Sequence, residues 1–252
     1  MNKTTDRKLV NILGVQVFSK TRSEVLALVK QHLDAKYRFS LVTPNPEIVL
    51  RAVKDNKLRE ILNSATFAVA DGVGLRPWVP VTPGRQLLLD LLSIAELRGL
   101  KVFFLGGRLG VISRTLARVR EEYPAVNARG DSAALFDNFA NPINSSEEKK
   151  LNKVLQDIKN FKPDLLFVAL GSPKQEYFID RWLNKLPVTG MMAVGGSLDY
   201  FSGTKPLPPK WMADLGLEWL WRGFTQKGHY KRVFKSVVIF PLRVIESKLQ
   251  AK

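Results

Sequence analysis

The sequence contains no cysteine. This absence excludes disulfide bonds and every metal site built on thiolates, although it does not identify the compartment. Only two histidines occur, His32 and His229, and they are too far apart in the chain to match the spacing of metal ligands. No Asp-X-Asp triplet occurs either, so the carboxylate pair that commonly holds Mg²⁺ or Mn²⁺ on a diphosphate is missing. We therefore expect neither a metal nor a cofactor.

Long apolar runs are also missing. No stretch of the chain reaches the roughly 18 apolar residues that a transmembrane helix needs. The N-terminal segment MNKTTDRKLVNILG lacks the apolar centre of a signal peptide. We found no internal repeat and no low-complexity tract. The sequence therefore predicts a cytoplasmic protein, unless something holds it on a membrane surface.

Acidic residues are scarce relative to basic ones. The 252 residues include 39 Lys and Arg against 23 Asp and Glu, a formal net charge of +16. This surplus favours an anionic partner, such as nucleic acid, a phosphorylated ligand or an anionic membrane face. The length is sufficient for one large domain, or for one domain with an appendage.

Apolar runs alternate with amphipathic segments along most of the chain. Extended segments surround Gly14 in residues 9–18, and we expect strands over 39–43, 66–70, 101–105, 126–130, 164–170 and 189–196. Helices are predicted over 21–32, 45–62, 86–98, 110–122, 145–160 and 173–183, with an irregular segment at 75–83. Because the strands are uniformly apolar, both of their faces should be buried. The pattern predicts an α/β fold with a mostly parallel sheet and helices on both faces.

Capping signals mark several of these helix starts. The segments TRSE (21–24) and SSEE (145–148) each match a capping box. Asn45 before Pro46 supplies an N-cap and a first-turn proline. Glu47 then lies where a negative charge is favourable near the helix N-terminus.

Polar and glycine residues follow the carboxyl end of nearly every predicted strand. In open sheets of this kind, ligands bind beyond those ends, so the residues should share one edge. They are Thr43 and Asn45, Asp71 and Gly72, Gly106 and Gly107, Gly171 to Gln175, and Gly195 to Asp199.

Two of these strand ends are glycine turns. Gly106 and Gly107 in FFLGGRLG lead into a helix, an arrangement that lets backbone N–H groups approach a phosphate. Gly195 and Gly196 in VGGSLD repeat it, with Asp199 placed to accept hydrogen bonds from a base or ribose. Each turn is equally explained by a tight bend that needs a positive φ. Together they favour a nucleotide ligand.

Three further side chains are candidates for chemistry. Asp71 follows a buried strand, where desolvation raises the pKa of a carboxylate and suits it to act as a general base. A turn residue that caps its own loop would look the same. Lys174 and Gln175 lie in a first helical turn from which they can reach a ligand, although an ordinary exposed turn has similar residues.

The C-terminal segment has a different composition. Residues 205–252 contain ten Lys or Arg and three acidic residues, with aromatic residues interleaved (Trp211, Trp219, Trp221 and Phe224). Basic helices with aromatic residues bind membrane interfaces, so we expect contact with an anionic membrane surface. A solvated helix packed on the domain and a basic face that binds RNA are the alternatives.

Six motifs occur in an order found in one family. They are TPNPEI (43–48), ADGVG (70–74), FFLGG (103–107), ALGSPKQE (169–176), VGGSLD (194–199) and GLEWLWR (216–222). In this set the chain resembles the WecG/TagA/CpsF family, glycosyltransferase family 26, over nearly its whole length. The resemblance implies a Rossmann-like core in residues 1–204 and a membrane-associating helical appendage in residues 205–252.

The resemblance also implies a reaction. It is the inverting, metal-independent transfer of N-acetylmannosamine, its uronic acid or a related hexose from a UDP-sugar. The acceptor would be an undecaprenyl-diphosphate-linked sugar at the cytoplasmic face of the membrane, in the synthesis of teichoic acid or another surface polysaccharide. No nucleic-acid partner is expected on this basis, and a homo-oligomer stays open.

Position by position, the resemblance assigns roles to six residues. Asp71 matches the general base, Thr43, Asn45 and Gln175 match pocket residues, and Arg222 and Arg232 match appendage arginines that meet a diphosphate. The glycine turns, Lys174 and Asp199 complete the predicted substrate site.

The chain also departs from the family pattern. Its 75–83 segment is shorter, Gln86 replaces an aspartate, and Leu207-Pro208-Pro209 and His229 replace basic positions. These differences leave open a relative that binds a UDP-sugar or a lipid diphosphate without transferring it. A nucleic-acid-binding protein is a third alternative, supported only by the net charge.

Overall fold

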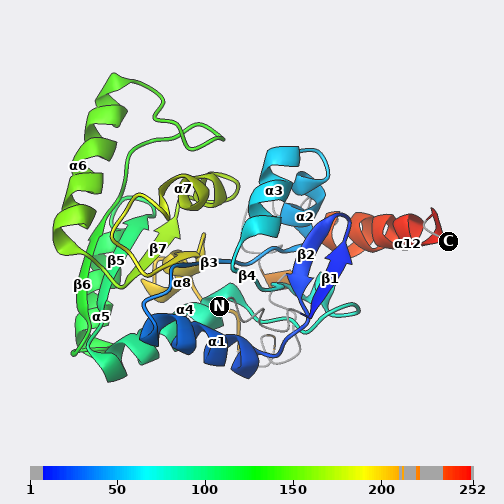
Figure 1. Ribbon diagram of the computed structural model, residues 1–252, viewed down its shortest axis with the longest axis horizontal. Coiled ribbons are helices and arrows are strands. Elements are labelled where there is room, and N and C mark those ends of the chain that lie inside the picture. Colours follow the sequence, from blue (N-terminus) through cyan, green and yellow to red (C-terminus); the bar gives the residue numbers. More distant parts are fainter. Residues whose placement is uncertain (1–7, 210–211, 213–219, 222–234, 251–252) are drawn as a thin grey trace.

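Six strands form one parallel sheet in the computed structural model, which describes residues 8–209, 212, 220–221 and 235–250 (Figure 1). The strands are β3 (Phe39–Val42), β4 (Phe67–Ala68), β5 (Lys101–Gly106), β6 (Asn127–Asp131), β7 (Leu165–Ala169) and β8 (Gly190–Ala193). Their order is β4-β3-β8-β7-β5-β6, and each neighbouring pair is parallel. The predicted α/β fold is confirmed. A separate antiparallel hairpin of β1 (Leu9–Ile12) and β2 (Val15–Phe18) contacts the β4 edge.

Helices cover both faces of this sheet. They are α1 (Arg22–Asp34), α2 (Pro46–Ala52), α3 (Asn56–Ser64), α4 (Gly84–Arg98), α5 (Val111–Glu122), α6 (Ser145–Phe161), α7 (Lys174–Trp182) and α8 (Ser197–Phe201). Two short helices, η1 (Val73–Leu75) and η2 (Lys235–Ile239), and the C-terminal α12 (Phe240–Gln250) complete the described elements.

The two faces of the sheet bury separate hydrophobic clusters. Along β5, Val102 and Phe104 join the cluster under α1, α4, α5 and α8, whereas Phe103 and Leu105 join the cluster under α2, α3, α6 and α7. Successive strand residues point to opposite faces, so every position of a doubly covered strand is apolar. This explains the uniformly apolar runs of the sequence.

The single helix predicted over 45–62 is wrong, because the structure has two helices there. α2 ends at Ala52, and α3 begins at Asn56. Between them Asp55 is extended, and its carboxylate accepts a hydrogen bond from the Leu58 N–H at 3.0 Å. Such an N-cap starts a new helix. The apolar residues on both sides keep a helical spacing, so the sequence pattern did not reveal the break between the two helices.

Other boundaries also differ from the prediction. The cap of α6 is Asn144, whose side chain accepts from the Glu147 N–H, so the predicted capping box at 145–148 is wrong. The box at 21–24 is confirmed. The strand predicted over 66–70 is shorter in the structure. The ladder of β4 with β3 contains only Phe67 and Ala68, and β4 lies at the edge of the sheet, where strands are often short.

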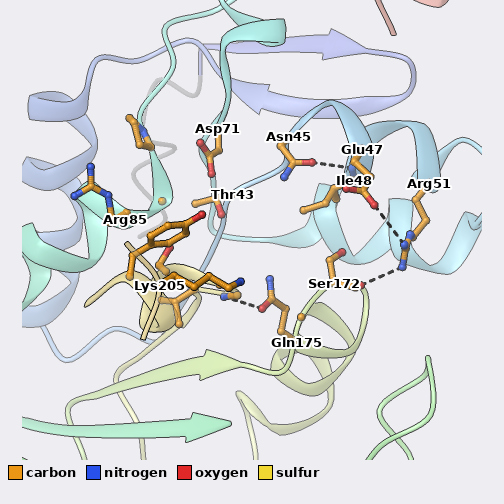
Figure 2. A pocket seen from close by; sticks show the side chains of 18 residues that line it. Thr43, Asn45, Glu47, Ile48, Arg51, Asp71, Arg85, Ser172, Gln175 and Lys205 are labelled. Atoms are coloured by element: carbon orange, nitrogen blue, oxygen red, sulfur yellow. Dashed lines mark hydrogen bonds and ion pairs between the residues drawn. The ribbon is translucent and has the colours of Figure 1, made fainter. Parts of the chain in front are cut away.

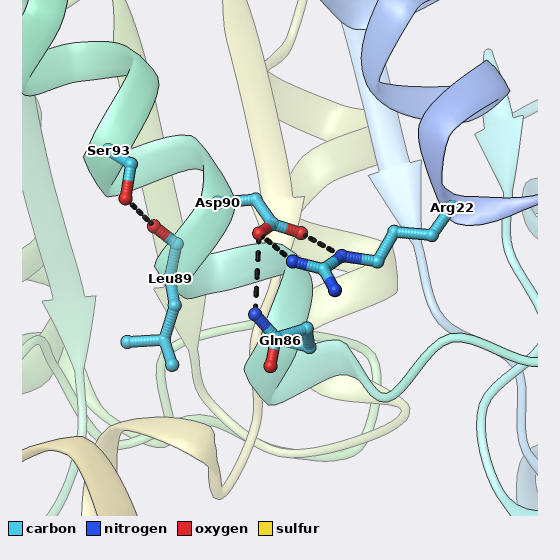
Figure 3. A network of polar contacts seen from close by, with 5 residues as sticks. All are labelled: Arg22, Gln86, Leu89, Asp90 and Ser93. Carbon is cyan, nitrogen blue, oxygen red and sulfur yellow. Dashed lines mark hydrogen bonds and ion pairs between the residues drawn. The ribbon is translucent and has the colours of Figure 1, made fainter.

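A polar network joins α1 to α4 on the face away from α7 (Figure 3). Asp90 accepts two hydrogen bonds from the Arg22 guanidinium, and the Gln86 amide donates to the same carboxylate at 3.3 Å. Gln86, one of the departures from the family pattern, is therefore part of a helix–helix contact.

The C-terminal helix packs against the core. Phe240 is fully buried, and its ring meets that of Trp78 edge-on at 5.7 Å. Trp78 belongs to the short 75–83 segment, so this segment supports the helix. Whether residues 205–252 form a separate domain stays a prediction. Among the described residues, no helix has both the length and the apolar character that a membrane span requires.

Candidate active site

One cavity of about 340 Å³ opens beyond the carboxyl ends of four adjacent strands. Its lining residues follow β3 (Thr43, Asn45, Glu47, Ile48 and Arg51), β4 (Asp71, Pro83, Gly84 and Arg85), β7 (Gly171, Ser172 and Gln175) and β8 (Val194, Gly195, Gly196, Ser197, Tyr200 and Lys205). Parallel strands place these ends on one edge, as predicted. The lining is mostly polar or charged, which suits a hydrophilic ligand such as a sugar.

The strand end of β3 supplies a hydroxyl and an amide. Thr43 is buried at the wall of the cavity. The side-chain oxygen of Asn45, Oδ1, accepts from the Ile48 N–H at 3.0 Å and caps α2, with Pro46 in the first turn (Figure 2). Because capping occupies the Asn45 oxygen, its NH₂ group is the part that can meet a ligand.

Asp71 lies beside Thr43 in the cavity (Figure 2). Its backbone N–H donates to the Pro44 carbonyl at 2.9 Å, which ties the end of β4 to that of β3. Both side chains face Gly84, the first residue of α4. A Cβ built on Gly84 would lie 3.2 Å from Thr43 Oγ1 and 3.5 Å from Asp71 Oδ2. The carboxylate is therefore on the cavity side and on the predicted edge of the sheet.

Gln175 is buried on the opposite wall, where two hydrogen bonds fix its amide. Its oxygen accepts from the Gly195 N–H at 3.0 Å, and its nitrogen donates to Glu176 at 2.9 Å. Burial raises the pKa of the Glu176 carboxyl above its ordinary value, against the opposing effect of the Gln175 hydrogen bond. The network joins α7 to the turn after β8 and holds the Gln175 amide in one orientation.

Three basic side chains line the cavity. Arg51 lies one turn after Glu47, 3.9 Å from its carboxylate, and donates to the Ser172 carbonyl at 3.1 Å (Figure 2). Lys205 forms an ion pair of 2.7 Å with Asp199. Arg85 lies in the first turn of α4.

Several predicted site residues lie outside the cavity lining. Gly106 ends β5, one strand further along the sheet, and Gly107 follows it, with its N–H donating to the Ala169 carbonyl at 3.0 Å. Lys174 donates to the Phe136 carbonyl at 2.8 Å. Asp199 is buried behind Lys205. The structure thus gathers Thr43, Asn45, Asp71, Gln175, Gly195 and Gly196, whereas Arg222 and Arg232 lie outside the described residues.

Sequence reasoning did not single out Arg51, Arg85, Tyr200 or Lys205. Arg51 had a recognisable signal, because it follows Glu47 by four residues and so shares its helix face. Lys205 had none, since it lies well beyond β8 and returns to the cavity only through the fold. Within the described residues, no group of three or more His, Asp and Glu side chains is arranged to hold a metal ion.

A family model for the glycosyl transferase WecG/TagA/CpsF family matches residues 10–252. The chain belongs to this family. The WecG/TagA/CpsF resemblance seen in the six motifs is thereby confirmed, and the protein is a glycosyltransferase. Its cavity at the strand ends is the candidate active site of this family member.

Two curated relatives of the family have the same name. An N-acetylglucosaminyldiphosphoundecaprenol N-acetyl-beta-D-mannosaminyltransferase of Staphylococcus aureus (strain NCTC 8325 / PS 47) is 32% identical over 96% of this chain and 94% of its own length. The protein of that name from Bacillus subtilis (strain 168) is 30% identical over 94% of this chain and 90% of its own length. The similarity therefore extends over the core and the C-terminal segment.

Proposed function

We propose that this glycosyltransferase moves N-acetylmannosamine, or a closely related hexose, from a UDP-sugar to an N-acetylglucosaminyl-diphosphoundecaprenol acceptor. The observation that carries the proposal is the similarity, over nearly the whole chain, to two relatives whose names state the transfer of N-acetylmannosamine to this acceptor. The polar cavity, with the Asp71 carboxylate at its wall, supports it. The product would serve the synthesis of a cell-surface polymer.

In the proposed reaction Asp71 is the general base. A hydroxyl oxygen of the acceptor attacks the anomeric carbon, and its proton passes to the Asp71 carboxylate. The bond between the anomeric carbon and the donor phosphate breaks, and UDP leaves with the electron pair. Attack opposite the leaving group inverts the anomeric centre. Thr43, the Asn45 NH₂ group and Gln175 would hold sugar hydroxyl or acetamido groups.

We propose that basic side chains take the place of a metal at the diphosphates. The sequence lacks the Asp-X-Asp pair that commonly holds such an ion. Arg222 and Arg232, in the C-terminal segment, are proposed to meet a diphosphate. Charge-assisted hydrogen bonds from arginine to phosphate are strong and often bidentate.

The membrane-bound acceptor requires the enzyme to work at a membrane surface, and α12 supports such contact. Leu242, Ile245 and Leu249 are more than half exposed on this helix, while Phe240 and Val244 are buried against the core. Arg243 and Lys248 add positive charge nearby. An exposed apolar face with basic neighbours favours binding to anionic lipid.

The Asp71→Asn variant tests the role of the base. We expect the transfer rate to fall about 10²–10⁴-fold, since positioned proton transfer contributes this much. UDP affinity, measured by calorimetry, should stay close to that of the wild type. Asp157→Asn, on the exposed face of α6, is the matched control and should keep full activity. An active Asp71→Asn enzyme would reject the role, and a wild type that binds UDP without transfer would instead indicate a binding protein.

A further inference from the structure

The Lys205 ammonium lies in the cavity and is held from behind by a buried carboxylate. Its Nζ is 2.7 Å from Asp199 Oδ2, and the two side chains are 25% and 11% exposed. The Lys205 backbone N–H also donates to the Asp199 carbonyl at 2.9 Å. The ring of Tyr200 lies 5.8 Å from the ammonium, within the range of a cation–π contact. These contacts fix the ammonium at the cavity wall.

The ammonium retains the capacity to bind a ligand. A lysine has three N–H donors. Asp199 is the only acceptor that Lys205 Nζ contacts within the described part of the chain. Two N–H groups of the Lys205 ammonium are thus left to donate to a phosphate oxygen, and charge-assisted hydrogen bonds of this kind are strong.

The other two basic side chains of the cavity are placed differently, and the Arg85 guanidinium points away from Thr43 and Asp71 (Figure 2). Arg51 lies beside Glu47 at the end of the cavity formed by α2, and its guanidinium donates to the Ser172 carbonyl (Figure 2). The Lys205 side chain instead extends below Thr43 and Asp71 and points toward Gln175, which lies on the opposite wall (Figure 2). A sugar bound between these two walls would have Asp71 on one side and Lys205 on the other.

We propose that Lys205 binds the diphosphate of the nucleotide donor and stabilises the negative charge that develops on UDP as it leaves. This inference rests on the proposed function. In a displacement with inversion, the attacking hydroxyl and the leaving phosphate lie on opposite sides of the anomeric carbon. With Asp71 as the base, the departing phosphate would lie on the side of the sugar away from Asp71, where the Lys205 ammonium is proposed to meet it. Lys205 transfers no proton in this step, and Asp199 is the residue that positions it.

The test compares the binding of UDP and uridine to the full chain by calorimetry, without acceptor. A charge-assisted hydrogen bond contributes enough that Lys205→Met should weaken UDP binding about 10–100-fold. Uridine binding should stay within about twofold of the wild type, because uridine has no phosphate. Lys205→Arg, which keeps the charge, should recover most of the UDP affinity.

Lys150→Met is the matched control for loss of a lysine from a buried carboxylate. Lys150 pairs with Glu147 at 2.6 Å, and the Glu147 side chain is 8% exposed. This variant should bind UDP like the wild type, even if its stability falls. Unchanged UDP binding in Lys205→Met, or an equal loss for UDP and uridine, would overturn the proposal.

The test of Lys205 and the test of Asp71 as the general base can fail separately. If Lys205→Met loses UDP selectively while Asp71→Asn remains active, the Lys205 site stands and the assigned base is wrong. If Asp71→Asn is inactive and Lys205→Met binds UDP normally, the base stands and the Lys205 site is wrong. A wild-type protein that binds neither UDP nor uridine would reject both.

Discussion

At the scale of single residues, the close approach of Gly84 to Thr43 and Asp71 controls the shape of the site. The first helical position of α4 accepts alanine without backbone strain, but its Cβ would lie 3.2 Å from Thr43 Oγ1. That contact is tighter than usual, so the Thr43 hydroxyl or the helix start must move by a few tenths of an ångström.

We expect Gly84→Ala to lower the transfer rate about tenfold while the melting temperature stays close to that of the wild type. Misplacement of reacting groups by a fraction of an ångström reduces rates by this order. Ser93→Ala, on the exposed side of the same helix, should leave the rate unchanged. Equal rates for Gly84→Ala and the wild type would show that Thr43 and Asp71 tolerate the displacement.

Glu176 gives the stability of the protein a pH dependence. Burial raises the pKa of its carboxyl above the ordinary 4.5. A raised pKa means that the folded state binds the proton more tightly than the unfolded state. The contribution of protonated Glu176 to the free energy of unfolding is therefore complete below about pH 4.5. It is lost as pH rises toward the raised pKa, by at most about 1.4 kcal/mol per pH unit.

We expect the free energy of unfolding to decrease as pH rises above about 4.5, and Glu176→Gln to flatten this slope. Urea denaturation at several pH values measures both. Hydrogen bonds from Thr21 and Lys150 lower the pKa of Glu24 and Glu147, respectively. These two carboxylates therefore change the free energy of unfolding only below about pH 4.5. An identical slope in Glu176→Gln and the wild type would contradict the assignment.

At the scale of elements, the break between α2 and α3 creates a tie to α7. Asp55, the cap of α3, also accepts a hydrogen bond from the Tyr177 hydroxyl, at 3.0 Å to Oδ1. Burial and this carboxylate raise the pKa of Tyr177 to about 12. The stabilisation by the hydrogen bond is thus present below pH 10 and is lost as pH rises through about 12.

Tyr177→Phe should reduce the free energy of unfolding by about 1.5–3 kcal/mol at pH 7, the usual contribution of a hydrogen bond to a charged group. Chemical denaturation measures the change. Tyr37→Phe is the control, because Tyr37 is 67% exposed, and it should have no effect. If both variants unfold at the same denaturant concentration, the tie between α3 and α7 contributes nothing.

At the scale of the whole molecule, the net charge of +16 and the exposed apolar face of α12 predict binding to anionic lipid vesicles. Replacing Leu242, Ile245 and Leu249 by serine should reduce sedimentation with anionic vesicles about tenfold or more, since each buried apolar side chain contributes roughly 1.5–3 kcal/mol. High salt should weaken binding of the wild type as well.

The matched control for this prediction is Leu97→Ser with Leu109→Ser. These leucines are 86% and 99% exposed on other elements and should not affect vesicle binding. Deletion of residues 205–252 should release the protein as the triple variant does. If the triple variant sediments like the wild type, α12 is not the membrane-binding surface.

The sequence by itself determined the fold class, the order of strands along the chain and the edge that carries the site. Uniformly apolar strands are a local property, and parallel strands must end at one edge. Thr43, Asn45, Asp71, Gln175, Gly195 and Gly196 could therefore be predicted to lie near one another. The family motifs added the reaction class.

Only the tertiary structure decided which strand ends meet in the cavity. The order β4-β3-β8-β7-β5-β6 brings four ends together and leaves that of β5, with Gly106 and Gly107, one strand away. The turn after α8 brings Lys205 back to the cavity, where its ammonium pairs with the buried Asp199. Strand order depends on packing between residues far apart in the chain, so no local pattern specifies it.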